Sequence, residues 1–127
     1  MEQNTKPLIL YVDDDRDMLE SFKIGLEDRG FTLLTASSGE EALESLKTHT
    51  PDLIIADLRM QPMNGFDLYQ TIRKNERYQK IPFFFLTAVD DFLAQKYGQK
   101  LGVDAYITKP VDLDNLDAII RSKLADK

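Results

Sequence analysis

Residues 8–15 read LILYVDDD, so five apolar residues stand directly before three aspartates. A short run that is apolar throughout is typical of a strand covered on both faces of a parallel sheet. Four similar runs follow at Phe31 to Ala36, Leu53 to Ala56, Pro82 to Thr87 and Ala105 to Thr108. The run at Phe31 to Ala36 alternates more between apolar and polar residues, which favours a place at the edge of the sheet.

Segments whose apolar residues follow a helical period separate these runs. The five segments cover residues 18–26, 42–46, 66–72, 91–102 and 113–124. Gly30 can end the first helix, Ser38 with Glu41 predicts a capping box for the second, and Asp112 is placed to cap the fifth. Gly98 lies inside the fourth, which is therefore expected to be the least firmly held. The alternation predicts an α/β fold of the (βα)5 type with a doubly wound parallel sheet.

The length and composition of the chain exclude several classes of function. A chain of 127 residues predicts one domain over 1–127, and its net charge of −6 argues against nucleic acid or an anionic membrane as a direct partner. The lack of cysteine excludes disulfides and thiolate sites, and the single His49 cannot form a histidine cluster. No apolar run approaches the length of a membrane span, and Met1 to Lys6 is polar rather than a signal sequence, so we expect a cytoplasmic protein.

Polar side chains follow the predicted strands where the strands end, which is the edge at which ligands bind in open parallel sheets. The side chains are Asp13 and Asp14 after the first strand, Asp57 after the third, Thr87 at the end of the fourth and Lys109 after the fifth. Three carboxylates so close together cannot all stay ionised without a cation between them. Carboxylate oxygens suit Mg²⁺, which keeps several waters and also takes phosphate oxygens. The sequence therefore predicts a magnesium site here.

Asp57 in this setting is arranged to attack a phosphorus atom. Carboxylates form aspartyl phosphates in proteins. The metal and the Lys109 ammonium would neutralise the charge that spreads over the transferred group, and the Thr87 hydroxyl could donate a hydrogen bond to one of its oxygens. The strand-end residues thus indicate phosphoryl transfer to Asp57.

In these residues the chain closely resembles the receiver domain of bacterial two-component response regulators. The matching motifs are the pair Asp13-Asp14, Asp57 followed eight residues later by Gly65, Thr87-Ala88, and the stretch DAYITKP at 104–110. The resemblance covers Leu8 to Leu124 and implies a flavodoxin-like sheet with the strand order 2-1-3-4-5.

The resemblance also implies roles for single residues. Asp57 is the phosphoacceptor, Asp14 a direct Mg²⁺ ligand, Asp13 a ligand through water, and the backbone carbonyl of Arg59 completes the metal site. Lys109 pairs with the phosphoryl group, and its bond to Pro110 is cis. Thr87 and Tyr106 form the switch, because a Thr87 drawn toward the phosphoryl group leaves space into which Tyr106 can rotate.

The implied partners are a sensor histidine kinase or phosphotransfer protein, which supplies the phosphohistidine, and a downstream output domain or target protein. The target binds the face built from the fourth helix, the fifth strand and the fifth helix, which is also a candidate homodimer interface. No direct binding to nucleic acid or membrane is expected. The domain is not an enzyme on other substrates, since it catalyses only its own phosphorylation and dephosphorylation.

One departure from the family pattern lies in the loop from Arg59 to Asn64. The family usually carries proline four residues after the phosphoacceptor, whereas here Gln61 stands there and Pro62 follows. We expect this loop to take an altered path, which bears on the placement of Arg59 more than on the role of Asp57.

Other classes of function fit the sequence less well. An aspartyl-phosphate phosphatase would need a second acid two residues after its nucleophile, where Arg59 stands. A flavodoxin-like flavin carrier would need a hydroxyl- and glycine-rich phosphate loop after the first strand, where this chain has acids. A protein-interaction module that is never phosphorylated remains an alternative, although it would not require the full set of site residues.

Overall fold

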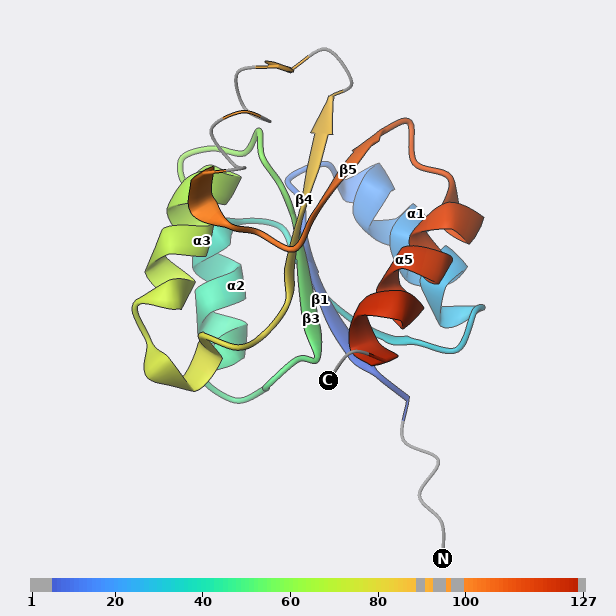
Figure 1. Ribbon diagram of the computed structural model, residues 1–127, viewed down its shortest axis with the longest axis horizontal. Helices are drawn as coiled ribbons and strands as arrows, with labels where there is room; N and C mark the ends of the chain where they lie inside the picture. Colours follow the sequence, from blue (N-terminus) through green and yellow to red (C-terminus); the bar gives the residue numbers. More distant parts are fainter. Residues whose placement is uncertain (1–5, 89–90, 93–95, 97–99, 126–127) are drawn as a thin grey trace, which may run out of the picture.

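The computed structural model describes residues 6–88, 91, 92, 96 and 100–125 and contains one five-stranded parallel sheet (Figure 1). The strands lie in the order β2-β1-β3-β4-β5 and all adjacent pairs are parallel, which confirms the predicted fold. Their bounds are β1 Leu8–Val12, β2 Thr32–Ala36, β3 Leu53–Asp57, β4 Phe83–Ala88 and β5 Ala105–Lys109. β2 is an edge strand, as its alternating pattern predicts.

Helices cover both faces of the sheet. Figure 1 shows α2 and α3 on one face and α1 and α5 on the other. Their bounds are α1 Arg16–Glu27, α2 Gly39–Leu46, α3 Gly65–Arg73 and α5 Leu113–Ala125, with a 3-10 turn, η1, at Glu76–Tyr78. Half of the fourth predicted helix, at 91–102, falls on residues 93–95 and 97–99, which lie outside the described residues. No helix in the described ranges combines the length and the apolar character that crossing a bilayer requires.

Side-chain caps determine where three helices begin, and two of them, Ser38 and Asp112, are the caps that the sequence predicts. Asp15 accepts hydrogen bonds from the backbone of α1, and Ser38 and Asp112 do the same for α2 and α5. The capping box at α2 differs in one contact from the prediction. The Glu41 carboxylate accepts from the backbone N–H and hydroxyl of Ser37, one residue before the cap. This contact ties the end of β2 to the start of α2.

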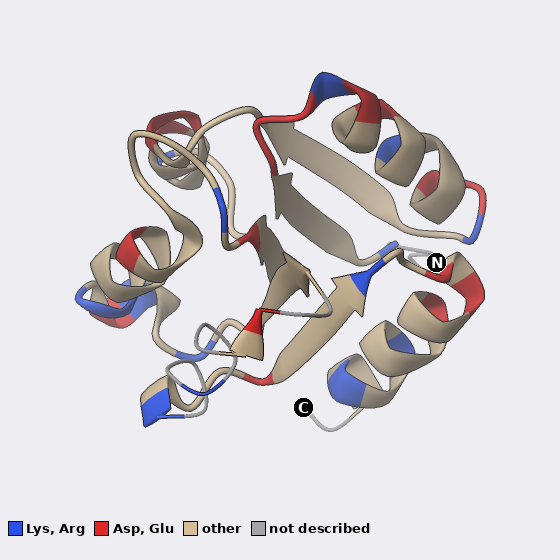
Figure 2. Cartoon of the chain, turned by 90° about the horizontal axis from the view of Figure 1, so that it is seen from above, with Lys and Arg blue, Asp and Glu red and all other residues tan. Residues whose placement is uncertain are grey.

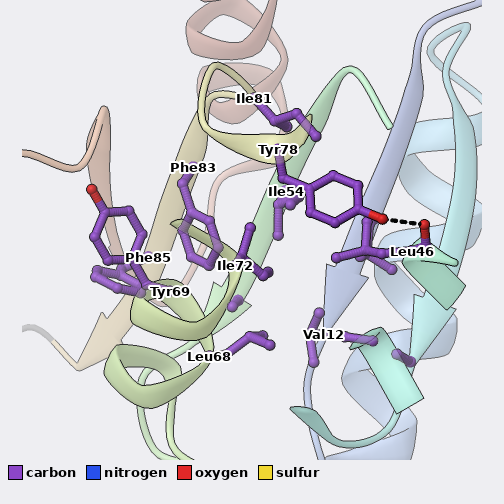
Figure 3. Packing of buried hydrophobic residues seen from close by; sticks show 14 of the residues in the cluster. Val12, Leu46, Ile54, Leu68, Tyr69, Ile72, Tyr78, Ile81, Phe83 and Phe85 are labelled. Atoms are coloured by element: carbon purple, nitrogen blue, oxygen red, sulfur yellow. Dashed lines mark hydrogen bonds between the residues drawn. The ribbon is translucent and has the colours of Figure 1, made fainter. Parts of the chain in front are cut away.

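The sheet separates two hydrophobic clusters. Phe83 and Phe85 pack under α2 and α3, whereas Phe84 points to the cluster under α1 and α5. Figure 3 shows the first cluster, in which the buried Tyr78 hydroxyl donates a 2.6 Å hydrogen bond to the Leu46 carbonyl. β3 is buried along its whole length, as expected for a strand covered on both faces. This rigid double-sided core holds the carboxyl ends of the strands in place.

Candidate functional site

The site lies at the carboxyl edge of the sheet, where three polar side chains are buried. Among the described residues, the buried polar or charged side chains are Asp13, Asp57 and Thr87, and all three stand at this edge. Figure 2 looks onto the edge and shows acidic and basic segments around the strand ends. Because burying a charged group costs free energy unless it is paired, this concentration makes the edge the candidate functional site.

Asp57 ends β3 and is held by two donors. Its Oδ2 atom accepts a 2.7 Å hydrogen bond from Nζ of Lys109, and its Oδ1 atom accepts a 2.9 Å bond from the backbone N–H of Arg59. Burial by itself lowers the pKa of Lys109, but the hydrogen bond to Asp57 and the charges of Asp57 and Asp13 outweigh it and raise that pKa. The ammonium therefore stays charged beside the carboxylate.

Asp13 follows β1 and is fully buried next to Asp57. Its Oδ2 atom accepts from the Tyr11 hydroxyl and its Oδ1 atom accepts from the Asp15 backbone N–H at 3.0 Å. Burial raises the pKa of Asp13, and the nearby charge of Asp57 adds to this, although both hydrogen bonds and Lys109 act in the opposite direction. Two carboxylates therefore share the site with one ammonium.

The other residues expected at the site lie around this pair. Asp14 follows Asp13 with an exposed side chain. Thr87 is buried, and its hydroxyl makes a long 3.5 Å contact to the Ala88 carbonyl. Tyr106, the second residue of β5, packs its ring 5.7 Å from that of Phe85. Its hydroxyl is buried and finds no hydrogen-bond partner in the described part of the chain. Burial raises the pKa of Tyr106 to about 12.

The loop after β3 reaches across to the segment after β4. The Arg59 guanidinium contacts Oδ2 of Asp91 through Nε at 2.9 Å and through a terminal nitrogen at 2.7 Å. Arg59 thus touches Asp57 with its backbone and a second loop with its side chain. The Gln61–Pro62 bond, at the point where the sequence departs from the family pattern, is cis, and so is the Lys109–Pro110 bond.

Gly65 brings the start of α3 close to the end of β3. Its N–H donates a 3.1 Å hydrogen bond to the Leu58 carbonyl. A Cβ atom at this position would lie 2.7 Å from the Asp57 carbonyl oxygen and 2.9 Å from Cα of Leu58. Only glycine allows this approach without a shift of the backbone. The spacing of eight residues between Asp57 and Gly65 therefore has a steric reason.

The donor set suits a hard divalent cation. Asp13 and Asp57 supply two adjacent buried carboxylates, and Mg²⁺ typically takes one or two carboxylates together with water and phosphate oxygens. Among the described residues, no three acidic or histidine side chains gather into a preformed metal group. Since Mg²⁺ does not require such a group, the residues present fit it.

Comparison with known proteins identifies the family. Residues 9–121 match the response regulator receiver domain. The chain belongs to this family. As a receiver domain it has the phosphoacceptor role in two-component signalling. It is 38% identical over 118 residues to the response regulator Rre1 of Synechocystis, covering 92% of this chain and 51% of that protein. It is 34% identical over 116 residues to PhoP of Bacillus subtilis, an alkaline phosphatase synthesis regulator, covering 91% and 48%.

Solved receiver structures resemble this receiver domain along almost its whole length. The receiver protein from Pseudomonas putida matches with a TM-score of 0.85 at 34% identity, covering 93% of this chain and 98% of that one. The chemotaxis response regulator CheY4 of Vibrio cholerae matches with a TM-score of 0.85 at 27% identity, with the same coverage. The curated relatives are longer, and the chain spans about half the length of those two.

The sequence predicts which residues meet at this edge of the receiver domain but misses several of their contacts. Tyr11 reads as one more apolar residue of β1, and its bond to Asp13 is not anticipated. The available signal is a lone hydroxyl in an apolar strand, two residues before an acid and hence on the same side of the strand. The Arg59–Asp91 ion pair leaves no such pattern, because it joins two loops.

Proposed function

We propose that Asp57 accepts a phosphoryl group from a phosphohistidine on a partner histidine kinase or phosphotransfer protein and later loses it to water. The observation that carries this proposal is the 2.7 Å contact of a charged Lys109 with a buried Asp57 at the strand ends. A carboxylate held in this way can act as a nucleophile beside a cation that neutralises the incoming group.

The transfer balances without a further reactant. An oxygen of Asp57 bonds to phosphorus while the bond from phosphorus to the histidine nitrogen breaks, and the imidazole keeps the electron pair. In the later step water attacks phosphorus, the bond to Asp57 breaks, and the carboxylate and inorganic phosphate are released. The chain has one histidine, His49, which is exposed after α2 and hydrogen-bonded locally, so the donor comes from outside.

Lys109 and Thr87 would hold the transferred group. Phosphorylation adds about −1.5 to −2 of charge and three acceptor oxygens, enough for one to three charge-assisted hydrogen bonds. Lys109 already points its ammonium at Asp57 and can keep one of these contacts. Within the described residues the Thr87 hydroxyl makes a single long contact, 3.5 Å to the Ala88 carbonyl, so moving toward a phosphoryl oxygen costs it little.

Mg²⁺ would be held by Asp13 and Asp57, with Asp14 and the Arg59 carbonyl as the further ligands implied by the family. When bound, it supplies positive charge that lowers the repulsion between the carboxylates and the incoming phosphoryl oxygens. Asp13 contributes a fixed carboxylate, since both of its oxygens accept hydrogen bonds. Asp57 keeps its backbone bond to Arg59 and its contact with Lys109.

Tyr106 and Thr87 would carry the signal outward from the site. The Tyr106 ring packs on Phe85, two residues before Thr87 in β4, so a displaced Thr87 bears on the same wall of side chains. The buried hydroxyl has no described partner and therefore little to hold it in one orientation. The change would reach the face around β5 and α5, where a target or a second copy would bind differently in the two states.

Residues 1–127 form a single receiver domain, and this domain turns over no substrate other than its own phosphoryl group. It works in the cytoplasm and hands its signal to an output domain or target protein. Direct contact with nucleic acid or membrane is not part of its role.

Incubation with acetyl phosphate and MgCl₂ tests the proposal. Mass spectrometry of the intact protein should show a gain of one phosphoryl group that is lost in alkali, and Asp57→Ala should show none. No gain in the wild type, or an equal gain in Asp57→Ala, would remove Asp57 from the reaction. Turnover of a phosphate ester by the isolated protein would favour a phosphatase instead.

A further inference from the structure

Tyr11 carries a hydroxyl group at a core position that phenylalanine could also fill. Tyr11 is fully buried in β1, and its ring stacks on that of Phe22 with centroids 4.5 Å apart. Phenylalanine would make the same stacking contact. A buried hydroxyl is costly unless it is hydrogen-bonded, so its presence here calls for a specific partner.

That partner is Asp13, which the hydroxyl reaches along the same side of β1. The Tyr11 hydroxyl donates to Oδ2 of Asp13, while the Asp15 backbone N–H donates to Oδ1 at 3.0 Å. The carboxylate is therefore held at both oxygens, once from the core and once from the loop. With the two donors on opposite oxygens, rotation of the carboxylate breaks at least one bond.

Both groups that donate to Asp13 are uncharged, which matters as much as their position. Lys109 is bonded to Asp57, so a cation already neutralises that carboxylate directly. The two donors to Asp13 are a phenol and an amide, both neutral, which fix the carboxylate while leaving its negative charge for a cation.

We propose that Tyr11 is a positioning residue of the cation site, whose hydroxyl fixes the Asp13 carboxylate in the orientation that helps to hold Mg²⁺. This inference rests on the proposed function, because it assigns Asp13 to the cation. Partners of metal-binding carboxylates orient those ligands, and their loss typically weakens metal affinity by about 10- to 100-fold. Tyr11 would affect phosphorylation only through Asp13.

Tyr78 provides a matched control. Tyr78 ends η1, ahead of β4 and therefore at the opposite edge of the sheet from the site. Its hydroxyl is also buried and donates a 2.6 Å hydrogen bond, but to the carbonyl of Leu46, the last residue of α2 (Figure 3). Tyr11→Phe and Tyr78→Phe each remove one buried hydroxyl and keep the ring. Both variants should lower the melting temperature, whereas a change in Mg²⁺ affinity is expected for Tyr11→Phe alone.

The experiment is calorimetric titration of MgCl₂ into the wild type and both variants, followed by phosphorylation with acetyl phosphate at varied MgCl₂. Tyr11→Phe should raise the dissociation constant for Mg²⁺ about tenfold. It should raise the MgCl₂ concentration for half-maximal phosphorylation by the same factor, while the rate at saturating MgCl₂ stays within about twofold of wild type. Tyr78→Phe should leave both constants unchanged.

The outcomes separate this inference from the proposed function. Equal Mg²⁺ affinity in the wild type and Tyr11→Phe, tighter binding in Tyr11→Phe, or the same weakening in Tyr78→Phe would overturn the role of Tyr11. Each of these results would leave phosphorylation of Asp57 standing. A wild type that takes up no Mg²⁺ and no phosphoryl group would instead refute the proposed function itself.

Discussion

Nζ of Lys109 lies 2.7 Å from Oδ2 of Asp57, although β4 separates the strands that carry them. The Asp57 side chain is 5% exposed and that of Lys109 is 35% exposed, so the pair sits at the boundary between core and solvent. Lys109 crosses over the end of β4 to reach the carboxylate. Loss of this ion pair should therefore change both the free energy of unfolding and the rate of phosphorylation.

Removal of the Lys109 charge should impair phosphorylation strongly and stability mildly. Lys109→Met keeps the length of the side chain but leaves Asp57 and Asp13 without their ammonium. We expect the rate of phosphorylation by acetyl phosphate to fall about 100-fold. The free energy of unfolding should fall by about 1–2 kcal/mol, less than for a fully buried pair because solvent screens Lys109.

Lys123→Met is the control for this variant. Lys123 pairs with Asp104 at 2.8 Å before β5, on the edge of the sheet away from the site. Its loss should leave the phosphorylation rate unchanged. Equal loss of rate in both variants, measured by intact mass over time, would show that the effect of Lys109 is not local.

The burial of Asp13 predicts a gain in stability when its charge is removed. Asp13→Asn can keep its contacts, because the Tyr11 hydroxyl can turn and accept from the new amide. In buffer containing EDTA, the variant should be more stable than the wild type at pH 7 by about 1–2 kcal/mol. Denaturant unfolding measures this difference.

The pH dependence of that difference follows from the raised pKa of Asp13. The unfolded chain loses this proton near pH 4, whereas the folded protein keeps it to a higher pH. Wild-type stability contributed by this group therefore falls as pH rises through that window, and the penalty stays constant above it. The advantage of Asp13→Asn should thus grow from pH 4 upward, while the exposed Asp14→Asn should show none. An advantage that shrinks with rising pH would contradict this account.

The close approach at Gly65 predicts a large steric effect. In Gly65→Ala the new methyl group meets backbone atoms of Asp57 and Leu58, which cannot move without shifting the phosphoacceptor. We expect a loss of about 1–3 kcal/mol in unfolding free energy and slower phosphorylation. In the control, Gly39→Ala, the methyl group meets the Sδ, Cγ and Cβ atoms of Met63, a flexible and half-buried side chain rather than backbone, so the loss of stability should be smaller than at Gly65. A smaller effect at Gly65 than at Gly39 would refute the steric explanation.

Removing the Tyr106 hydroxyl should not destabilise the protein, unlike the removal of a hydrogen-bonded tyrosine hydroxyl from a core. Its hydroxyl is buried with no partner in the described ranges, so Tyr106→Phe removes an unsatisfied group. The free energy of unfolding should stay equal or rise by up to about 1 kcal/mol, whereas Tyr78→Phe should lower it by about 1–2 kcal/mol. Thermal or chemical unfolding of the two variants side by side decides the matter. A clear loss in Tyr106→Phe would mean that the hydroxyl is bonded.

Much of the fold follows from local sequence patterns. Strands such as β3 are apolar almost throughout because both faces are covered, and this pattern does not depend on which side chains pack against them. Asp15, Ser38 and Asp112 cap helices because short polar side chains satisfy the first free N–H groups. Strand bounds shift by a residue, as at Phe31, which packs in the core just before β2. Element ends depend on hydrogen bonds that side-chain type does not specify.

The site is predictable in its composition but not in its contacts. Parallel strands bring Asp13, Asp57, Thr87 and Lys109 to one edge whatever the loops do, so their meeting follows from order along the chain. Which donor each carboxylate oxygen takes depends on rotamers and loop paths. For this reason the Tyr11–Asp13 bond, the Arg59–Asp91 pair and the Asn64–Asp67 capping box of α3 emerge only from the structure.

Chemical trapping of the acceptor residue identifies which carboxylate carries the phosphoryl group. After incubation with acetyl phosphate and MgCl₂, borohydride reduces an aspartyl phosphate to homoserine, and peptide mass spectrometry locates the converted residue. We expect conversion at Asp57 alone and no conversion without MgCl₂. Conversion at Asp13 or Asp14, or none at Asp57 in a protein that has gained a phosphoryl group, would contradict this expectation.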